Sequence, residues 1–182
     1  MRVLHLLSRL DYGGTENQVG DLVSRLVDSG DSVSICAARG RRCALLPPAA
    51  DFFPTRFLPL LRPIAVRRVR TVARRKAVDV LHAHQREPTI VAARVTRSTG
   101  IPLAVTLQSQ FDWDLDLQWV RDTITCLIVL SPSWRSIVMR EDPDLGERCV
   151  VIPNAVGAER FAAARESHSL LYASRIDEFH AS

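Results

Sequence analysis

Short apolar runs alternate with longer amphipathic stretches along this chain. The apolar runs are continuous, which predicts strands buried on both faces of a sheet. They span residues 2–8, 32–37, 78–84, 103–108, 126–131 and 149–153, with shorter candidates at 57–60 and 170–174. The clearest helical stripe, ended by Gly30, consists of Val19, Leu22, Val23, Leu26 and Val27. Further helices are predicted from Pro63 through the basic segment and at residues 88–98, 112–125 and 132–140.

Strands that alternate with helices are typical of a parallel sheet. The sequence therefore predicts an α/β fold, a doubly wound, Rossmann-like parallel sheet with helices on both faces. The chain has 182 residues, 47% of them hydrophobic, which suffices for one domain with a sizeable core and not for two. No apolar run approaches the ~18 residues that cross a bilayer, and no targeting segment is predicted.

Arginine supplies nearly all of the positive charge. Of 24 Lys+Arg residues only Lys76 is a lysine, a bias that points to a GC-rich, bacterial genome. Lys76 follows arginines and no glycine loop, so a Walker A phosphate loop is excluded and a Schiff-base lysine is not expected. The four cysteines form no C-x-x-C pair, which favours free, mostly buried thiols over a zinc site.

Positive charge is concentrated between Arg62 and Lys76. This segment holds seven basic residues and no acid, so a net charge of +4 leaves −3 for the rest of the chain. The apolar stripe predicted beneath the arginines is Ile64, Val69, Val72 and Ala73. The segment is interpreted either as a solvated helix face or as a face that contacts anionic membrane lipid. The candidate membrane contacts are Arg67, Arg68, Arg70, Arg74 and Arg75.

Nucleic-acid binding is the competing interpretation of the basic segment. A basic stripe is the electrostatic footprint of such proteins. The three tryptophans, however, lie far from the stripe in sequence, and no helix-turn-helix or RNA-binding motif is present. No nucleic-acid partner is therefore expected.

Polar residues follow the predicted strands at their carboxyl ends, where open α/β sheets bind ligands. They are Ser8, His84, Gln108, Ser131 and Asn154. Gly13 and Gly14 directly precede the first helix, where free N–H groups and the helix dipole favour an anion. Because the two glycines do not form G-x-G-x-x-G, a nicotinamide dinucleotide site is not predicted.

His82 and His84 lie two residues apart on a predicted strand, so their side chains share one face. Such a pair suits a metal or a shared hydroxyl, but no third ligand is evident, and no metal site is predicted. His84, at the strand end, is the stronger candidate for a hydrogen bond to substrate or for proton transfer. The alternative is one buried and one solvent-facing imidazole.

Five segments resemble, in order, motifs of the family 4 glycosyltransferases. Residues 3–16 are similar to the opening strand and glycine loop of that family, and residues 78–84 to its D-v-v-H-a-H strand. Residues 129–133 resemble its v-S-e step from strand to helix. Residues 151–161 resemble its v-I-P-N-G-V-D…r-F hallmark, and residues 171–176 its l-L-y-v-G-R-L element.

This resemblance implies one half of a GT-B architecture, in which two Rossmann-like domains face each other across a cleft. It implies retaining transfer of a sugar from a nucleotide sugar to an acceptor hydroxyl, without a metal or other cofactor. His84 matches the family histidine near the reaction centre and is the catalytic candidate. Gly13 and Gly14 match the loop near the donor phosphates, and Arg175 matches the arginine that neutralises the departing diphosphate. The remaining substrate-binding candidates are Glu16 and Asn154.

The resemblance weakens toward the end of the chain. Ala155 stands where the family usually has glycine, Ser174 replaces the glycine of the G-R-L element, and no E-x7-E donor motif is present. The expected organisation is an acceptor-binding domain over residues 1–168. Residues 169–182 are then the end of a linker and the first strand of a donor-binding domain.

Three classes of function stay open. In the first, the chain is the acceptor-binding part of an incomplete hexosyltransferase, in the cytoplasm or peripheral to the inner face of the membrane. Its partners are then a nucleotide sugar, a sugar or lipid-linked acceptor, and a separate donor-domain chain. In the second, the chain is a non-catalytic acceptor-binding module or a remnant. A basic membrane- or nucleic-acid-binding protein is the third alternative.

Overall fold

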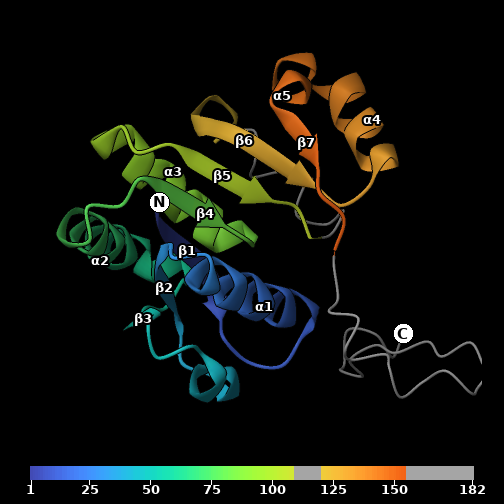
Figure 1. Ribbon diagram of the computed structural model, residues 1–182. Helices are drawn as coiled ribbons and strands as arrows, with labels where there is room; N and C mark the ends of the chain where they lie inside the picture. Colours follow the sequence, from blue (N-terminus) through green and yellow to red (C-terminus); the bar gives the residue numbers. More distant parts are fainter. Residues whose placement is uncertain (109–119, 155–182) are drawn as a thin grey trace, which may run out of the picture.

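Seven parallel strands form the central sheet, in the order β3-β2-β1-β4-β5-β6-β7 (Figure 1). The computed structural model describes residues 1–108 and 120–154. The strands are β1 (Arg2–Arg9), β2 (Ser32–Ala38), β3 (Asp51–Pro54), β4 (Val80–Ala83), β5 (Leu103–Thr106), β6 (Ile124–Val129) and β7 (Cys149–Val151). From β1 the chain therefore adds β2 and β3 on one side of the sheet, and then adds β4 to β7 on the other side of β1. The crevice between β1 and β4 is the switch point at which such sheets bind ligands.

Helices cover both faces of the sheet, as the sequence predicts. They are α1 (Gly14–Asp28), α2 (Arg62–Arg75), α3 (Arg86–Thr99), α4 (Pro132–Glu141) and α5 (Pro143–Glu147). The 3-10 turns in the described ranges are η1 (Arg41–Leu45), η2 (Pro59–Leu61) and η5 (Arg121–Thr123). In Figure 1, α1 lies on one face of the sheet, and α2 and α3 lie on the other. The doubly wound α/β prediction is confirmed.

Two apolar clusters, one on each side of the sheet, make up the core. The larger contains residues of α2, α3 and α4 together with Leu4 and Leu6 of β1. The smaller contains Val19 and Val23 of α1 together with Leu7 of β1 and residues of β2. β1 contributes to both clusters because successive side chains of a strand point to opposite faces. The odd-numbered positions Val3 and His5 consequently face the α1 side.

The predicted strand at residues 57–60 is wrong. Pro59 opens the 3-10 turn η2 there, because proline has no N–H to donate to a strand ladder. The third strand lies earlier, where Phe52 and Phe53 pair with Ile35 and Cys36 of β2. Aromatic side chains favour such a half-buried sheet position.

Two helix predictions also need correction. The helix expected over residues 112–125 does not reach its predicted end, since η5 ends at Thr123 and β6 begins at Ile124. In α2 the buried stripe is Ala65, Val69, Val72 and Ala73, whereas Ile64 is 66% exposed. The expected strand at residues 170–174 and the linker before it lie outside the described residues.

Two smaller expectations concern membrane spans and cysteines. Within residues 1–108 and 120–154, no helix is both long and apolar enough to cross a bilayer. All four cysteines are free, as expected, with Cys36 and Cys149 buried and Cys43 and Cys126 half-buried.

Candidate functional site

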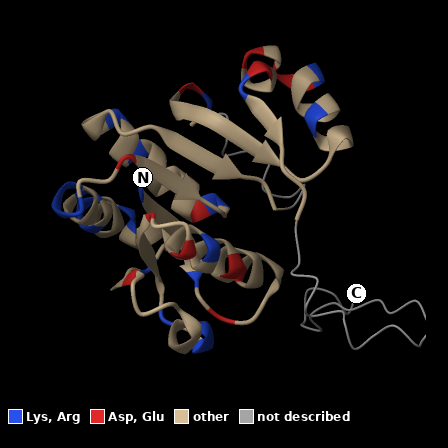
Figure 2. Ribbon diagram, in the orientation of Figure 1, with Lys and Arg blue, Asp and Glu red and all other residues tan. Residues whose placement is uncertain are grey.

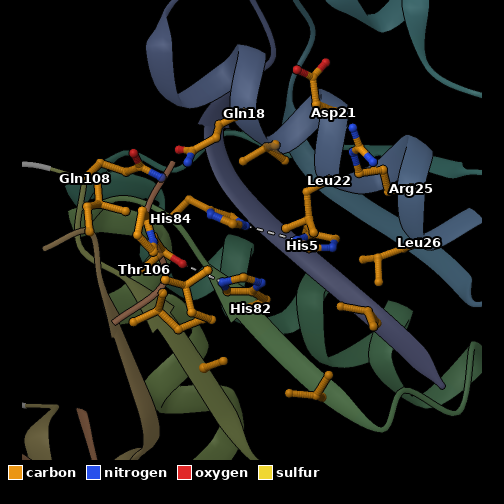
Figure 3. Close-up of a pocket in the computed structure, with 18 of the residues that line it drawn as sticks. His5, Gln18, Asp21, Leu22, Arg25, Leu26, His82, His84, Thr106 and Gln108 are labelled. Carbon is orange, nitrogen blue, oxygen red and sulfur yellow. Dashed lines mark hydrogen bonds between the residues drawn. The ribbon is translucent and has the colours of Figure 1, made fainter. Parts of the chain in front are cut away.

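A groove of about 420 Å³ lies between α1 and the adjacent sheet face (Figure 3). Its floor is built from alternate positions of neighbouring strands, since only every second side chain of a strand points to a given face. These floor residues are Val3 and His5 of β1, Val80 and His82 of β4, and Ala104 and Thr106 of β5. Its wall on the helix side includes Gln18, Leu22 and Leu26 of α1.

The sheet side of the groove changes from apolar to polar along the strand direction. Val3, Val80 and Ala104 line it near the amino ends of the strands. His84 and Gln108 line it at the carboxyl ends, beside Gln18 of α1 (Figure 3). These side chains place hydrogen-bonding groups at the edge where the switch point predicts ligand binding, while Asp21 and Arg25 line the groove farther along α1.

Three histidines meet on the floor of this groove. His5 of β1 is the direct register partner of His82 of β4, and His84 follows two residues later. The ring centroids of His82 and His84 are 4.1 Å apart, and those of His5 and His82 are 5.1 Å apart. The prediction that His82 and His84 share a face is therefore confirmed. The alternative with one solvent-facing imidazole is wrong, since both residues are at least 92% buried: His82 is 8% exposed and His84 2%.

Hydrogen bonds connect the cluster internally and to β5. His5 Nδ1 and His84 Nε2 are 3.0 Å apart, and His82 Nε2 is 2.8 Å from the Thr106 hydroxyl. Because His5 and His84 share one proton along this contact, one ring donates and the other accepts. The two outer nitrogens, His5 Nε2 and His84 Nδ1, are buried and have no hydrogen-bond partner in the described part of the chain.

All three imidazoles favour the neutral form. Burial lowers the pKa of His82 to about 4. Burial, and secondarily the charge of His82, holds the pKa of His5 well below its usual range. The pKa of His84 is lowered well below its usual range by burial and then by its two histidine neighbours. At neutral pH the cluster therefore offers uncharged nitrogens, which can accept hydrogen bonds or bind a cation.

The glycine loop before α1 has open space at one of its two glycines. A Cβ added at Gly14 would contact nothing within 4 Å, whereas the Glu16 carboxylate occupies the space over Gly13. Gly13 is the N-cap residue of α1 in an extended conformation and makes no side-chain cap. Before this loop, Ser8 N near the carboxyl end of β1 donates to the side chain of Gln85, the N-cap residue of α3, at 2.6 Å.

The other predicted strand-end residues divide between the groove and local structure. Gln108 and His84 line the groove, and Asn154 Oδ1 accepts a hydrogen bond from the Gln18 side chain of α1. Ser131 instead caps α4, since its hydroxyl accepts from Trp134 N at 3.3 Å. Arg175 lies outside the described residues.

Sequence reasoning missed His5, Gln18 and Thr106. His5 stands inside a continuous apolar run, and its meeting with His82 depends on β1 pairing with β4, which no local pattern specifies. A polar residue within such a buried run was the available signal. Gln18 precedes the apolar stripe of α1 by one position, so it lies at the edge of the buried face.

The basic segment forms α2 and has few charge partners. Arg62 binds Glu87 of α3 through two hydrogen bonds of 2.6 and 2.8 Å, and Lys76 pairs with Asp51 at 2.6 Å. Within the described ranges, the other five basic residues have no carboxylate within salt-bridge distance. They are the predicted contacts Arg67, Arg68, Arg70, Arg74 and Arg75. Figure 2 shows their charge gathered along this one helix.

Exposed apolar side chains precede this basic face. Leu60 of η2 is 90% exposed, and Ile64, in the first turn of α2, is 66% exposed. Ile64 lies three and four residues before the exposed Arg67 and Arg68, so these side chains share one stripe of the helix. Leu60 and Ile64 together form an apolar tip. Because η2 follows the parallel strand β3, this apolar tip lies toward the carboxyl edge of the sheet.

A family model described as Glycosyltransferase Family 4 matches residues 12–160. The chain belongs to glycosyltransferase family 4. No curated protein shows significant sequence similarity to it.

Solved structures share the fold at low sequence identity. The Anabaena protein HepE in complex with UDP-glucose is 18% identical, with a TM-score of 0.70, over 88% of this chain and 46% of its own. A glycosyltransferase from Rickettsia africae is 15% identical, with a TM-score of 0.74, over 92% of this chain and 46% of its own. A UDP-GlcNAc 2-epimerase from Methanocaldococcus jannaschii is 12% identical, with a TM-score of 0.64, over 85% and 46%. The chain thus spans less than half the length of each, and its sheet corresponds to one half of a GT-B glycosyltransferase.

Proposed function

We propose that this chain is the acceptor-binding half of a hexosyltransferase that transfers a sugar, with retention, from a nucleotide sugar to an acceptor hydroxyl. The observation that carries the proposal is the groove, which ends in His84 and Gln108 at the switch point of a family 4 domain. In this proposal the acceptor-binding domain covers residues 1–168, and residues 169–182 begin a donor-binding domain. Because the chain covers only 46% of the HepE and Rickettsia africae structures, donor binding in this proposal belongs mainly to a donor-binding domain and not to residues 1–168.

Each candidate residue receives a role from its chemistry. His84, the catalytic residue of the proposal, uses Nδ1 to hydrogen-bond the transferred sugar or the acceptor hydroxyl, because its Nε2 already faces His5. Gly14, beside Gly13, lets a phosphate approach the amino end of α1. Arg175 takes up the negative charge of the departing diphosphate. The further polar contacts to substrate come from Glu16 and Asn154.

The transfer chemistry of the proposal requires no resident cofactor. A departing nucleoside diphosphate needs positive charge and N–H donors, which an arginine and a helix amino end supply. The nucleotide sugar is the donor substrate. The HepE structure contains UDP-glucose, which supports a uridine nucleotide as the first donor to assay.

Turnover and acceptor binding separate the half-enzyme from its alternatives. The chain is incubated with UDP-glucose and a panel of sugar and polyprenyl-linked acceptors, and acceptor binding is followed by saturation-transfer NMR. We expect acceptor signals without product, and loss of those signals in His84→Phe. Product formed by the chain alone would overturn the half-enzyme proposal. No binding to any acceptor, with wild type and variant alike, would favour a remnant.

The second proposal is that the α2 face contacts an anionic membrane, which places the protein in the cytoplasm at the inner face of the membrane. Its support is the combination of Leu60 and Ile64 with arginines that have no carboxylate partner among residues 1–108 and 120–154. A cavity of about 310 Å³ beside them is lined by Arg67, Arg68 and Arg75, which can donate to a lipid phosphate. Apolar tips and basic stripes together are typical of interfacial helices.

Liposome co-sedimentation tests this contact. Each arginine near an anionic surface contributes about 1 kcal/mol, so Arg67→Gln with Arg68→Gln should weaken binding ~30-fold. Leu60→Ser should weaken binding to the same vesicles without changing its salt dependence. The matched control is Arg94→Gln, an exposed arginine on α3 outside this face. Equal binding to anionic and neutral vesicles, or binding unchanged in high salt, contradicts the proposal.

A further inference from the structure

Two buried polar atoms, one from β4's end and one from α1, belong to the polar end of the groove, at the carboxyl edge of the sheet. They are His84 Nδ1 and Gln18 Oε1, and neither has a hydrogen-bond partner among residues 1–108 and 120–154. Figure 3 shows both side chains at this end of the groove. We infer that one uncharged hydroxyl group binds between them, accepting a hydrogen bond from His84 and donating one to Gln18. The inference rests on the proposed function, which makes the ligand of this groove a sugar.

The amide of Gln18 has its nitrogen in use and its oxygen available. Gln18 Nε2 donates to Asn154 Oδ1, which leaves Gln18 Oε1 as a buried acceptor. An amide oxygen carries no proton, so it binds a donor and not the oxygen of a phosphate or carboxylate. Gln18 is half-buried, so a small movement of its side chain admits a ligand to both atoms.

Whether His84 donates or accepts depends on His5. Burial holds the pKa of both rings well below the usual range, so both are neutral at pH 7 and each carries one N–H. His5 Nδ1 and His84 Nε2 are 3.0 Å apart and share one of these two protons. The two rings therefore adopt the same tautomer, with the protons either on both Nδ1 atoms or on both Nε2 atoms.

The surroundings favour protons on both Nδ1 atoms. His84 Nδ1–H then lies at the polar end of the groove, beside the Gln18 amide (Figure 3). In the other tautomer the unshared N–H belongs to His5 Nε2, a buried atom without a described partner, on a ring that lies near Leu22 of α1. A buried N–H without an acceptor is the costlier arrangement. His5 is thus a positioning residue, which donates to His84 Nε2 and makes His84 Nδ1 a donor.

A hydroxyl is the group that satisfies both atoms at once. It accepts through a lone pair and donates through its proton, as His84 Nδ1–H and Gln18 Oε1 require. A diphosphate oxygen could accept from His84 but has no proton for Gln18, and an ammonium group could donate to Gln18 but cannot accept from His84. This point of the groove therefore selects a sugar hydroxyl, in contrast to the glycine loop, where the proposed function places a phosphate.

Imidazole ¹⁵N NMR of the full chain tests the tautomer without any ligand. Long-range ¹H–¹⁵N spectra separate protonated from unprotonated ring nitrogens, and we expect His5 and His84 to be protonated on Nδ1 at pH 7. His5→Asn keeps an N–H donor near the position of Nδ1 and should preserve the His84 tautomer. His5→Phe keeps a ring without a donor and should produce a mixture with the Nε2–H form. The wild-type spectrum is informative even where a variant fails to fold.

Glucose at millimolar concentration is the probe for the hydroxyl, with binding followed by amide chemical shifts of the full chain. Gln18→Leu and His84→Phe should each weaken glucose binding about tenfold. The double variant should bind no more weakly than either single variant, because one hydroxyl needs both side chains. The matched control is Arg25→Gln, on the same helix and lining the same groove, which should bind as wild type does. Inorganic phosphate should not displace glucose.

The contrary results are distinct. Protons on Nε2 of both rings in the wild type overturn the inference, and so does a Gln18→Leu protein that binds glucose as tightly as wild type. Additive losses in the double variant also overturn it, since two separate contacts are then present. An unchanged His84 tautomer in His5→Phe removes the positioning role of His5. Glucose binding that requires both side chains supports the site even where the acceptor panel reveals no acceptor, in which case the proposed function fails alone.

Discussion

Gly14 allows a role in binding to be separated from a role in folding. An added Cβ meets nothing within 4 Å, and the residue opens α1, where alanine is favoured over glycine by up to ~1 kcal/mol. Gly14→Ala should therefore leave the free energy of unfolding unchanged or slightly raised. If a phosphate approaches this backbone, as proposed, the same methyl group should weaken binding of UDP-glucose, measured as a dissociation constant by titration, about tenfold.

Gly100→Ala is the matched control for this experiment. Gly100 ends α3 in the left-handed region, with φ 75°, a conformation that costs alanine about 1 kcal/mol. It should lower the free energy of unfolding and leave nucleotide binding intact. Unaltered nucleotide binding in Gly14→Ala would remove the loop from the donor site.

Cys36 carries the clearest pH dependence among the thiols. Burial raises its pKa to about 11, with smaller opposing effects from a hydrogen bond to Thr55 and the charge of Arg68. An unperturbed cysteine loses this proton near pH 9.0, so from there to about pH 11 the folded state binds more protons than the unfolded chain. Stability must then fall as pH rises, by up to about 1.4 kcal/mol per pH unit from this group. Urea unfolding of wild type and Cys36→Ala between pH 8 and 11 should give a shallower slope for the variant; identical slopes would contradict it.

At the scale of single residues, the sequence identifies chemistry more reliably than contacts. The period of two along a strand correctly places His82 and His84 on one face. It cannot reveal His5, because that requires β1 and β4 to be neighbours at a fixed register. The same limit applies to Ser131, which looks like a site residue at a strand end but caps the following helix.

At the scale of elements, the stability of α4 tests whether Ser131 is a helix cap or a residue of the binding site. Its hydroxyl accepts from Trp134 N, and loss of such a cap costs about 1 kcal/mol. Ser131→Ala should therefore lower the free energy of unfolding by about 1 kcal/mol, seen as a lower midpoint of urea denaturation. Ser136→Ala, in the exposed middle of the same helix, should be neutral or slightly stabilising, because its hydroxyl bonds only back to Pro132 O. Equal effects of the two substitutions would exclude the cap.

The predicted boundaries of helices and strands are wrong where a proline or a loop interrupts an apolar pattern. Pro63 and Pro132 correctly mark the starts of helices, where a missing N–H costs nothing. Pro59 ends a predicted strand for the same chemical reason. Ile64 matches a helical stripe in sequence, yet it lies on the exposed side of α2, because the arginine-rich segment leaves the direction of its buried face weakly specified.

At the scale of the whole molecule, the sheet order creates the candidate site. Alternating strands and helices predict a parallel sheet, but they do not state that β1 lies at its centre between β2 and β4. That order produces the switch point, the meeting of His5 with His82, and a groove on the α1 side. Fold class follows from local patterns, whereas the site follows from pairings between segments about 80 residues apart.

The central position of β1 and the peripheral position of η2 predict opposite responses to one kind of truncation. Leu4 is fully buried in the larger core cluster, so Leu4→Ala should lower the free energy of unfolding by about 3 kcal/mol or more. Leu60 is 90% exposed, so Leu60→Ala should change it by less than ~0.5 kcal/mol. Urea denaturation followed by circular dichroism measures both. A stable Leu60→Ala protein that no longer binds anionic vesicles would show that this leucine serves a partner and not the core. A large loss of stability in Leu60→Ala would instead make the apolar tip part of the fold and remove the main structural support for membrane contact.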